Sequence, residues 1–148
     1  MNREQKQNKE LTERFPFLIP RNRFTRRIPD AYEYEYTELD MMPTGWKKAF
    51  GMQMIEELRE LLVKYDYLEQ YHVADIKEKW GVLRWDDNGV PDEAKEEYKA
   101  WLDKYENLST DTCLICGKPA EEWIDEHCVP YCDGCLHGSR LRRKRKDD

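Results

Sequence analysis

All five cysteines of this 148-residue chain fall within 23 residues. Cys113 and Cys116 form one C-x2-C pair, Cys132 and Cys135 form a second, and fifteen residues separate the pairs. This spacing is typical of a four-cysteine zinc site, in which each turn directs two sulfurs at one ion. Gly117 directly after the first pair permits the tight turn. We therefore expect one structural Zn²⁺, because four thiolates fill a tetrahedral shell and leave no open position for catalysis.

Other roles compete for these cysteines. Disulfides need an oxidising compartment, and the polar N-terminus "MNREQKQNKELTERF" has no apolar signal-peptide core. A thioredoxin-like redox pair belongs to a βαβ pattern, which this stretch lacks. Cys128 remains open as an alternative ligand, a reactive thiol or a small buried residue, with the last as the default. A Cys128 nucleophile served by His127 is disfavoured because adjacent side chains seldom face each other. His137 is expected to be a flanking polar residue.

Two amphipathic helices and a hairpin are expected to precede the cysteines. The first helix follows Pro43, with Thr44 as its cap, and the second opens at Pro91. Between them "YHVADIKEKWGVLRWDDNG" predicts a β-hairpin that turns near Gly81. The apolar stripes comprise Trp46, Phe50, Met54, Leu58, Leu61, Leu62 and Tyr65 in the first helix, and Ala94, Tyr98, Trp101, Leu102, Tyr105 and Leu108 in the second.

A tyrosine-rich stretch lies before the first helix. Tyr32, Tyr34 and Tyr36 alternate with Glu33 and Glu35, the period-2 pattern of a half-buried strand. The simpler interpretation is one aromatic face on the core and one acidic face in water. The alternative is an acidic, tyrosine-rich surface that resembles a nucleic-acid backbone to a partner.

Charge and spacing divide the chain into four parts. We expect a basic N-terminal segment (1–27), an α+β body (28–111), a zinc-ribbon-like module (112–138) and a disordered basic tail (139–148). The fold class is thus α+β, with two amphipathic helices packed on a small antiparallel sheet and a C-terminal zinc-ribbon-like hairpin. The candidate partner-binding residues are Arg21, Arg23, Arg26, Arg27, Glu33, Glu35, Arg140, Arg142, Arg143, Lys144, Arg145 and Lys146.

Composition and motifs restrict the function classes. No apolar run approaches the roughly 18 residues of a membrane span, so we expect a cytoplasmic protein. The sequence has no phosphate-binding Gly-rich loop, no G-x-S-x-G and no H-E-x-x-H, which disfavours an enzyme. Asp86 and Asp87 in "WDDNG" could hold a divalent cation, but this stretch matches an ordinary turn better. Formal charge is -6, and a zinc bound by four thiolates would take it to about -8.

Several stretches together resemble a family of small proteins encoded by phages and prophages of Gram-positive gut bacteria. They are "PFLIPRNRF", "YTELDMMPTGWKKAFG", "IKEKWGVLRWDDNG", "CLICGKPA" and "PYCDGC", in that order between about Glu13 and Cys135. The extra cysteine in "IDEHCVPYC" and the basic tail depart from the pattern, so any function of theirs is particular to this chain. The resemblance implies a bacterial host, but no particular activity.

Three functions follow as expectations. The first is a non-enzymatic, phage-type binding protein that occludes a bacterial protein or ribonucleoprotein complex, such as a CRISPR effector or another antiviral defence nuclease. The second is a nucleic-acid-binding regulator that uses the zinc hairpin and the basic segments "PRNRFTRR" and "RLRRKRK". The third is a sponge for a small signalling nucleotide, which would require a pocket.

Overall fold

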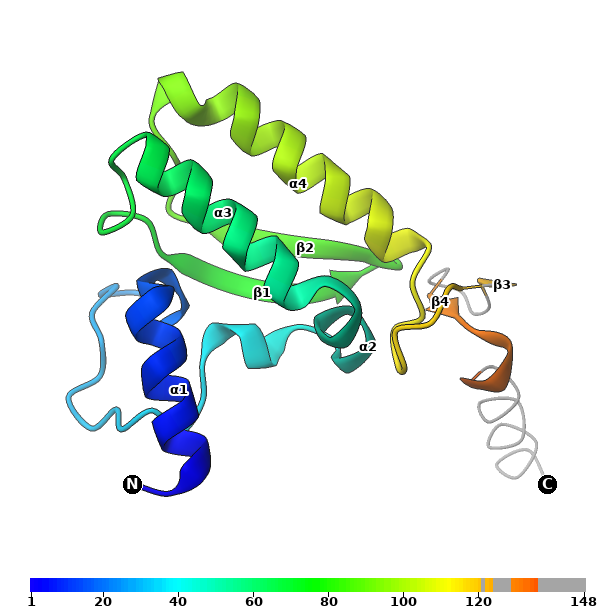
Figure 1. The fold of residues 1–148 in the computed structure, drawn as a ribbon, viewed down its shortest axis with the longest axis horizontal. Coiled ribbons are helices and arrows are strands. Elements are labelled where there is room, and N and C mark those ends of the chain that lie inside the picture. Colours follow the sequence, from blue (N-terminus) through cyan, green and yellow to red (C-terminus); the bar gives the residue numbers. More distant parts are fainter. Residues whose placement is uncertain (121, 124–128, 136–148) are drawn as a thin grey trace.

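A computed structural model describes residues 1–120, 122–123 and 129–135. Helices α3 (Met52–Lys64) and α4 (Lys95–Thr110) lie side by side over a two-stranded antiparallel sheet of β1 (Val73–Lys79) and β2 (Val82–Asp87) (Figure 1). A smaller antiparallel pair, β3 (Glu122–Trp123) and β4 (Pro130–Tyr131), follows α4. The predicted α+β class is confirmed.

The core forms between the helices and one face of the sheet. The Trp101 indole packs edge-on against Trp85 of β2 and donates a hydrogen bond to the Met54 carbonyl of α3, at 3.0 Å. Tyr105 is fully buried one turn further along α4. The buried positions recur at the spacing that the sequence predicts, and they comprise Met54, Ile55, Leu58, Leu61 and Leu62 of α3 with Val73, Ile76, Leu83 and Trp85 of the hairpin.

The first predicted helix begins where expected but is not regular. A short α2 (Thr44–Trp46) runs into a π-helical turn (η3, Lys47–Gly51) before α3 begins. Pro43 occupies the N-cap position and Thr44 makes no capping hydrogen bond, so the predicted capping role of Thr44 is wrong. Proline suits this position because it cannot donate a backbone hydrogen bond, which a helix start does not require.

The hairpin turn is confirmed at Gly81. Trp80 and Gly81 have φ angles of 56° and 82°, as in a type I′ turn, whose twist matches that of paired strands. Ile76 pairs with Trp85 across the strands, and the register shifts between Val73 and Asp75 at the open end of the hairpin. This irregularity bends β1 at residues 73–75, which line a polar pocket.

The strand predicted for the tyrosine-rich stretch does not form. Tyr34 has a left-handed φ of 65°, which interrupts the extended backbone. The Tyr32 ring packs on Tyr34 and Tyr36 rather than on the core, and its hydroxyl donates to the Tyr36 carbonyl. Side-chain amides of Gln5 and Asn8 hold this stretch through its carbonyl oxygens.

Those two amides belong to a helix that sequence patterns did not reveal. Helix α1 (Arg3–Arg14) begins with a capping box between Asn2 and Gln5. Thr12 is its only buried residue, so its sequence carries almost no apolar stripe. The short helix η1 (Pro16–Leu18) follows, and Phe15, Phe17 and Leu18 are fully buried in the core. Two more short helices complete the chain's described helices: η2 (Glu38–Met41), which contacts β1, and η4 (Asp92–Ala94), which leads into α4.

Candidate metal centre

The four predicted metal ligands meet at one point. The sulfurs of Cys113, Cys116, Cys132 and Cys135 all lie within 4.8 Å of one another. The Sγ atoms of Cys116 and Cys132 are 3.4 Å apart, well beyond the roughly 2.05 Å of a disulfide bond, and all four cysteines are free. Cys113 and Cys132 are buried while Cys116 and Cys135 are partly exposed. This arrangement can hold a metal ion.

Backbone hydrogen bonds shape the first C-x2-C turn. The Cys113 N–H donates to the Lys118 carbonyl at 2.7 Å, and the Gly117 N–H donates back to the Cys113 carbonyl at 3.1 Å. Gly117 has a φ of 84°, the left-handed conformation that glycine adopts without strain, as the sequence predicts. The Leu114 N–H donates to the Pro130 carbonyl at the start of β4, which brings the second pair of cysteines to the first.

The cysteine module is docked on α2 of the body. The Gly45 N–H donates to the Leu114 carbonyl at 2.8 Å, and the buried Trp46 indole donates to the Thr112 carbonyl at 3.0 Å. A Cβ atom at Gly45 would lie 2.1 Å from the Cys113 carbonyl oxygen and 2.7 Å from the Gly117 nitrogen. Two backbones therefore touch directly at this point, which only glycine permits.

The thiols influence one another's ionisation. Burial raises the pKa of Cys113, but backbone N–H groups of Cys116, Cys132 and Ile115 outweigh it and bring that pKa down to about 6. Burial and the adjacent sulfurs of Cys132, Cys116 and Cys113 raise the pKa of Cys135 to about 12. Four thiolates so close together repel, so a bound cation is what would allow all of them to ionise.

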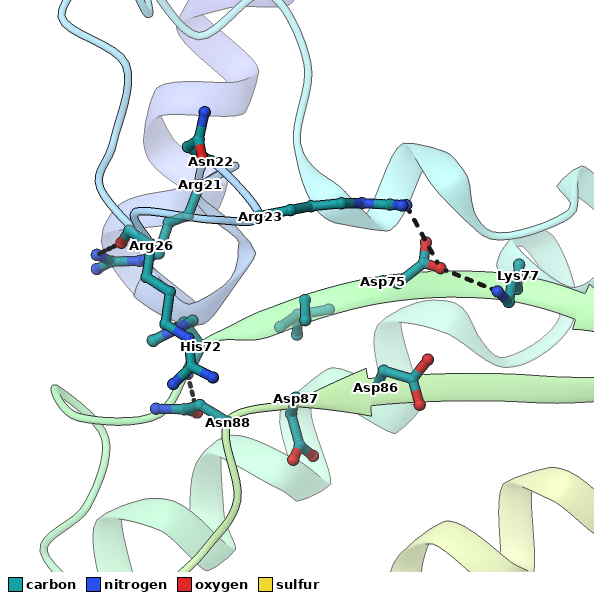
Figure 2. A pocket seen from close by; sticks show the side chains of 12 residues that line it. Arg21, Asn22, Arg23, Arg26, His72, Asp75, Lys77, Asp86, Asp87 and Asn88 are labelled. Atoms are coloured by element: carbon teal, nitrogen blue, oxygen red, sulfur yellow. Dashed lines mark hydrogen bonds and ion pairs between the residues drawn. The ribbon is translucent and has the colours of Figure 1, made fainter.

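The basic residues near the N-terminus lie elsewhere. Arg21, Arg23 and Arg26 line a polar pocket at the open end of the hairpin, together with residues 72–75, 77 and 86–88 (Figure 2). Arg27 is exposed in the same loop. Sequence reasoning missed this convergence, because strand residues about 50 and 60 positions away complete the pocket and no local motif signals them.

The remaining candidates divide into exposed and undescribed residues. Glu33 and Glu35 are exposed beside the tyrosine cluster. The predictions for Cys128, His127, His137 and the basic tail lie outside the described residues: Arg140, Arg142, Arg143, Lys144, Arg145 and Lys146. Asp87, considered as a cation ligand, accepts hydrogen bonds from the hydroxyls of Tyr71 and Tyr98 and from the Gly89 N–H, which is a structural role.

Comparisons of the chain with protein-family models, with curated proteins and with solved structures find no match. In the described part of the chain, no helix has both the length and the apolar character needed to cross a bilayer.

Proposed function

We propose that the protein is a non-enzymatic binding protein, stabilised by one structural Zn²⁺, that inhibits or redirects a bacterial macromolecular machine by occlusion. The observation that carries the proposal is the cluster of four thiols fixed to an acidic body. Four thiolates close the coordination shell of an ion, so the site supports a fold rather than a reaction. A partner-binding role then falls to the surface of the body.

Zn²⁺ is the ion that best suits this donor set. Zn–S bonds of about 2.3 Å in a tetrahedron place the sulfurs about 3.8 Å apart, and here they are 3.4 Å apart for Cys116 and Cys132 and within 4.8 Å throughout. A tetrahedral set of four sulfurs suits zinc or iron, which elemental analysis distinguishes. One zinc per chain is expected in protein purified without chelator, and iron or no metal would refute the assignment.

Two serine variants test which cysteines bind the metal. Cys132→Ser removes a buried member of the cluster and should lower the zinc content well below one per chain. Cys128→Ser is the matched control, since it removes the cysteine outside the two C-x2-C pairs. A normal zinc content in the Cys132 variant, or a loss in the Cys128 variant, would overturn the ligand assignment.

The charge of the body supports occlusion of a basic channel. Residues 28–111 carry 21 acidic and 10 basic side chains, and bound zinc makes the holo protein more acidic still. An acidic surface is drawn to a channel that binds nucleic acid and competes there with the phosphate backbone. Glu33 and Glu35, exposed on the tyrosine cluster, are the contacts to test first. An antiviral defence nuclease, such as a CRISPR effector, is the first target to test, by analogy with other small phage proteins.

Affinity purification from nuclease-treated bacterial lysate tests the proposal. A stoichiometric protein partner should survive nuclease, and its association rate should fall as salt rises, because screening weakens electrostatic steering. Glu33→Gln with Glu35→Gln should slow association more than Glu93→Gln with Glu96→Gln, an equal charge change on other exposed glutamates. A salt-independent association rate would remove the occlusion argument.

Deletion of Arg140 to Asp148 distinguishes this protein from a nucleic-acid-binding regulator. An occluding inhibitor should keep its protein target without the tail, whereas a regulator should lose most of its affinity for DNA or RNA. Nucleic acid recovered from an untreated lysate, with no protein partner after nuclease, would favour the regulator.

A further inference from the structure

The pocket at the open end of the hairpin has the size of a small-molecule site and a polar, charged lining. Its volume is about 380 Å³, within the range of roughly 300–1,000 Å³ that ligand pockets occupy. One wall is the loop of residues 21–26, and the other is formed by the outer face of β1 and β2 (Figure 2). The pocket is far in sequence from the cysteines, and the metal centre uses none of its residues.

The loop that forms the basic wall has a fixed shape. The Asn22 side-chain oxygen accepts hydrogen bonds from the N–H groups of Phe24 and Thr25, at 2.8 and 3.0 Å. Backbone hydrogen bonds close the loop from Asn22 N–H to the Arg27 carbonyl and from Arg26 N–H to the Asn22 carbonyl. Arg26 has a left-handed φ of 61°. Because the backbone is held in this way, the points from which the arginine side chains start are fixed before any ligand arrives.

Among the described residues, no carboxylate forms an ion pair with Arg21 or Arg26. Arg21 donates one hydrogen bond, to the Arg26 carbonyl, and its buried Nε atom has no partner within the described part of the chain. In the part of the chain that the structure describes, the Arg26 guanidinium makes no hydrogen bond or ion pair. Both charges act on His72, whose pKa falls because of burial and then because of Arg21 and Arg26, although Asp87 opposes this shift. Two like charges side by side, with no ion pair to a described carboxylate, favour an anionic ligand.

The opposite end of the pocket is acidic. Asp75 and Asp86 face each other across the strands, a pairing of like charges that is unfavourable by itself. Arg23 and Lys77 neutralise Asp75 at 3.6 and 3.4 Å (Figure 2). Among the described residues Asp86 has no ion pair, so its carboxylate remains available to accept hydrogen bonds. A divalent cation is disfavoured as the ligand of this pocket, because Arg23 and Lys77 already form ion pairs with Asp75.

The loop also carries an exposed aromatic ring, which lies outside the lining of the pocket. Phe24 is 96% exposed, the highest exposure of any large apolar side chain described, and it lies between Arg23 and Arg26 in the rigid loop. A phenylalanine held in water gives no stability to the fold. An exposed ring on this loop suits the base of a neighbouring nucleotide in a single strand, which can stack on it.

We propose that this pocket binds a nucleotide, with its phosphate at Arg21 and Arg26 and an amino group of its base donating to Asp86. Phosphate suits the two guanidiniums because it accepts several charge-assisted hydrogen bonds. Asp86 favours cytosine, adenine or guanine over uracil, which has no amino group to donate. This proposal does not rest on the metal centre or on inhibition of a partner.

Calorimetric titration of the zinc-loaded full chain with AMP, GMP, CMP and UMP tests the proposal. We expect saturable binding of one nucleotide per chain and weaker binding of the matching nucleosides. Arg26→Gln should weaken binding about tenfold or more, the effect of losing a charge-assisted hydrogen bond. Arg84→Gln is the matched control, an exposed arginine on β2 outside the pocket, and should leave affinity unchanged. Asp86→Asn should abolish the preference for CMP over UMP.

A six-nucleotide single strand distinguishes the two sources of this ligand. Tighter binding of the strand than of CMP, with a tenfold loss in Phe24→Ala, assigns the site to nucleic-acid strands. Equal or weaker binding of the strand assigns it to free nucleotides. The proposal fails if neither the strand nor any mononucleotide binds at millimolar concentration, if Arg26→Gln and Arg84→Gln behave alike, or if inorganic phosphate binds as tightly as the nucleotides.

Discussion

Gly45→Ala should detach the cysteine module from the body. The added Cβ would lie 2.1 Å from the Cys113 carbonyl oxygen, whereas contacts below 3.0 Å do not occur without movement. All three nearest atoms belong to the backbone, so no side chain can rotate away. The knuckle must therefore move by about 1 Å or more and give up the hydrogen bonds of Gly45 and Trp46. Strain of about 1–3 kcal/mol, together with about 1 kcal/mol for each hydrogen bond, predicts a destabilisation of about 3–5 kcal/mol.

Chemical denaturation of the zinc-loaded protein measures this change, and Gly51→Ala is the matched control. The nearest atom to a Cβ at Gly51 is the Lys47 side-chain Cγ at 3.4 Å, so alanine fits there. Since Gly51 is helical, alanine should stabilise by about 0.5–1 kcal/mol. A chelator competition should also show weaker zinc binding in Gly45→Ala alone. Equal unfolding free energies for the two variants would refute the direct backbone contact.

Three further predictions concern the metal, a buried carboxyl and a buried hydroxyl. Chelation of the zinc should unfold the cysteine module and expose it to protease, because structural zinc supplies on the order of 10 kcal/mol of apparent binding energy; resistance to protease after chelation would contradict this. Burial and the neighbouring Asp75 raise the pKa of Glu38 from 4.5 to about 7, against Arg23, so the folded state holds this proton more tightly than the unfolded state. The stabilisation that the protonated Glu38 carboxyl contributes is fully present below pH 4.5 and is lost as pH rises through 7. Glu38→Gln should remove that loss and be more stable than the wild type at pH 8 by about 1–3 kcal/mol, a range reduced for partial exposure; parallel stability profiles from pH 4 to 8 would count against it. Tyr71→Phe removes a hydroxyl that donates to Asp87 at 2.6 Å and accepts from the Trp85 indole at 2.9 Å. Thermal unfolding should show that the free energy of unfolding falls by about 1–3 kcal/mol. Tyr36→Phe, at an exposed tyrosine, is the control and should change it by no more than about 0.5 kcal/mol.

The sequence predicted those parts of the fold whose signals are local. Two C-x2-C pairs, two apolar helical stripes and a glycine turn are each recognisable from a few neighbouring residues, and the structure contains them, except that Leu108 of the second stripe is exposed. Helix α1 was missed because its only buried residue is Thr12, so tertiary contacts and a capping box stabilise it rather than an apolar stripe. The tyrosine strand was wrong because side-chain alternation does not determine the backbone angle of Tyr34.

Candidate sites followed the same division. The spacing of the four cysteines predicts a metal site. No sequence pattern predicts the role of Gly45, because that role depends on contact with the backbone of Cys113, 68 positions away. The nucleotide pocket is similar, because the fold alone brings Arg21 and Arg26 to Asp86. The arginine cluster was recognised as a partner-binding candidate from charge, but charge alone does not distinguish a solvated loop from one wall of a pocket.

The metal centre and the nucleotide pocket occupy opposite ends of the β1–β2 hairpin. The pocket lies at the open end, where β1 begins and β2 ends. At the turn end, the Leu83 N–H donates to the Ser109 hydroxyl near the end of α4, three residues before the cysteine module begins (Figure 1). A core of α3, α4 and the hairpin separates the two sites, so neither supplies atoms to the other. Chelation should therefore abolish whatever binding depends on the module while nucleotide affinity persists, and joint loss of both would mean that zinc maintains the whole body rather than one end of it.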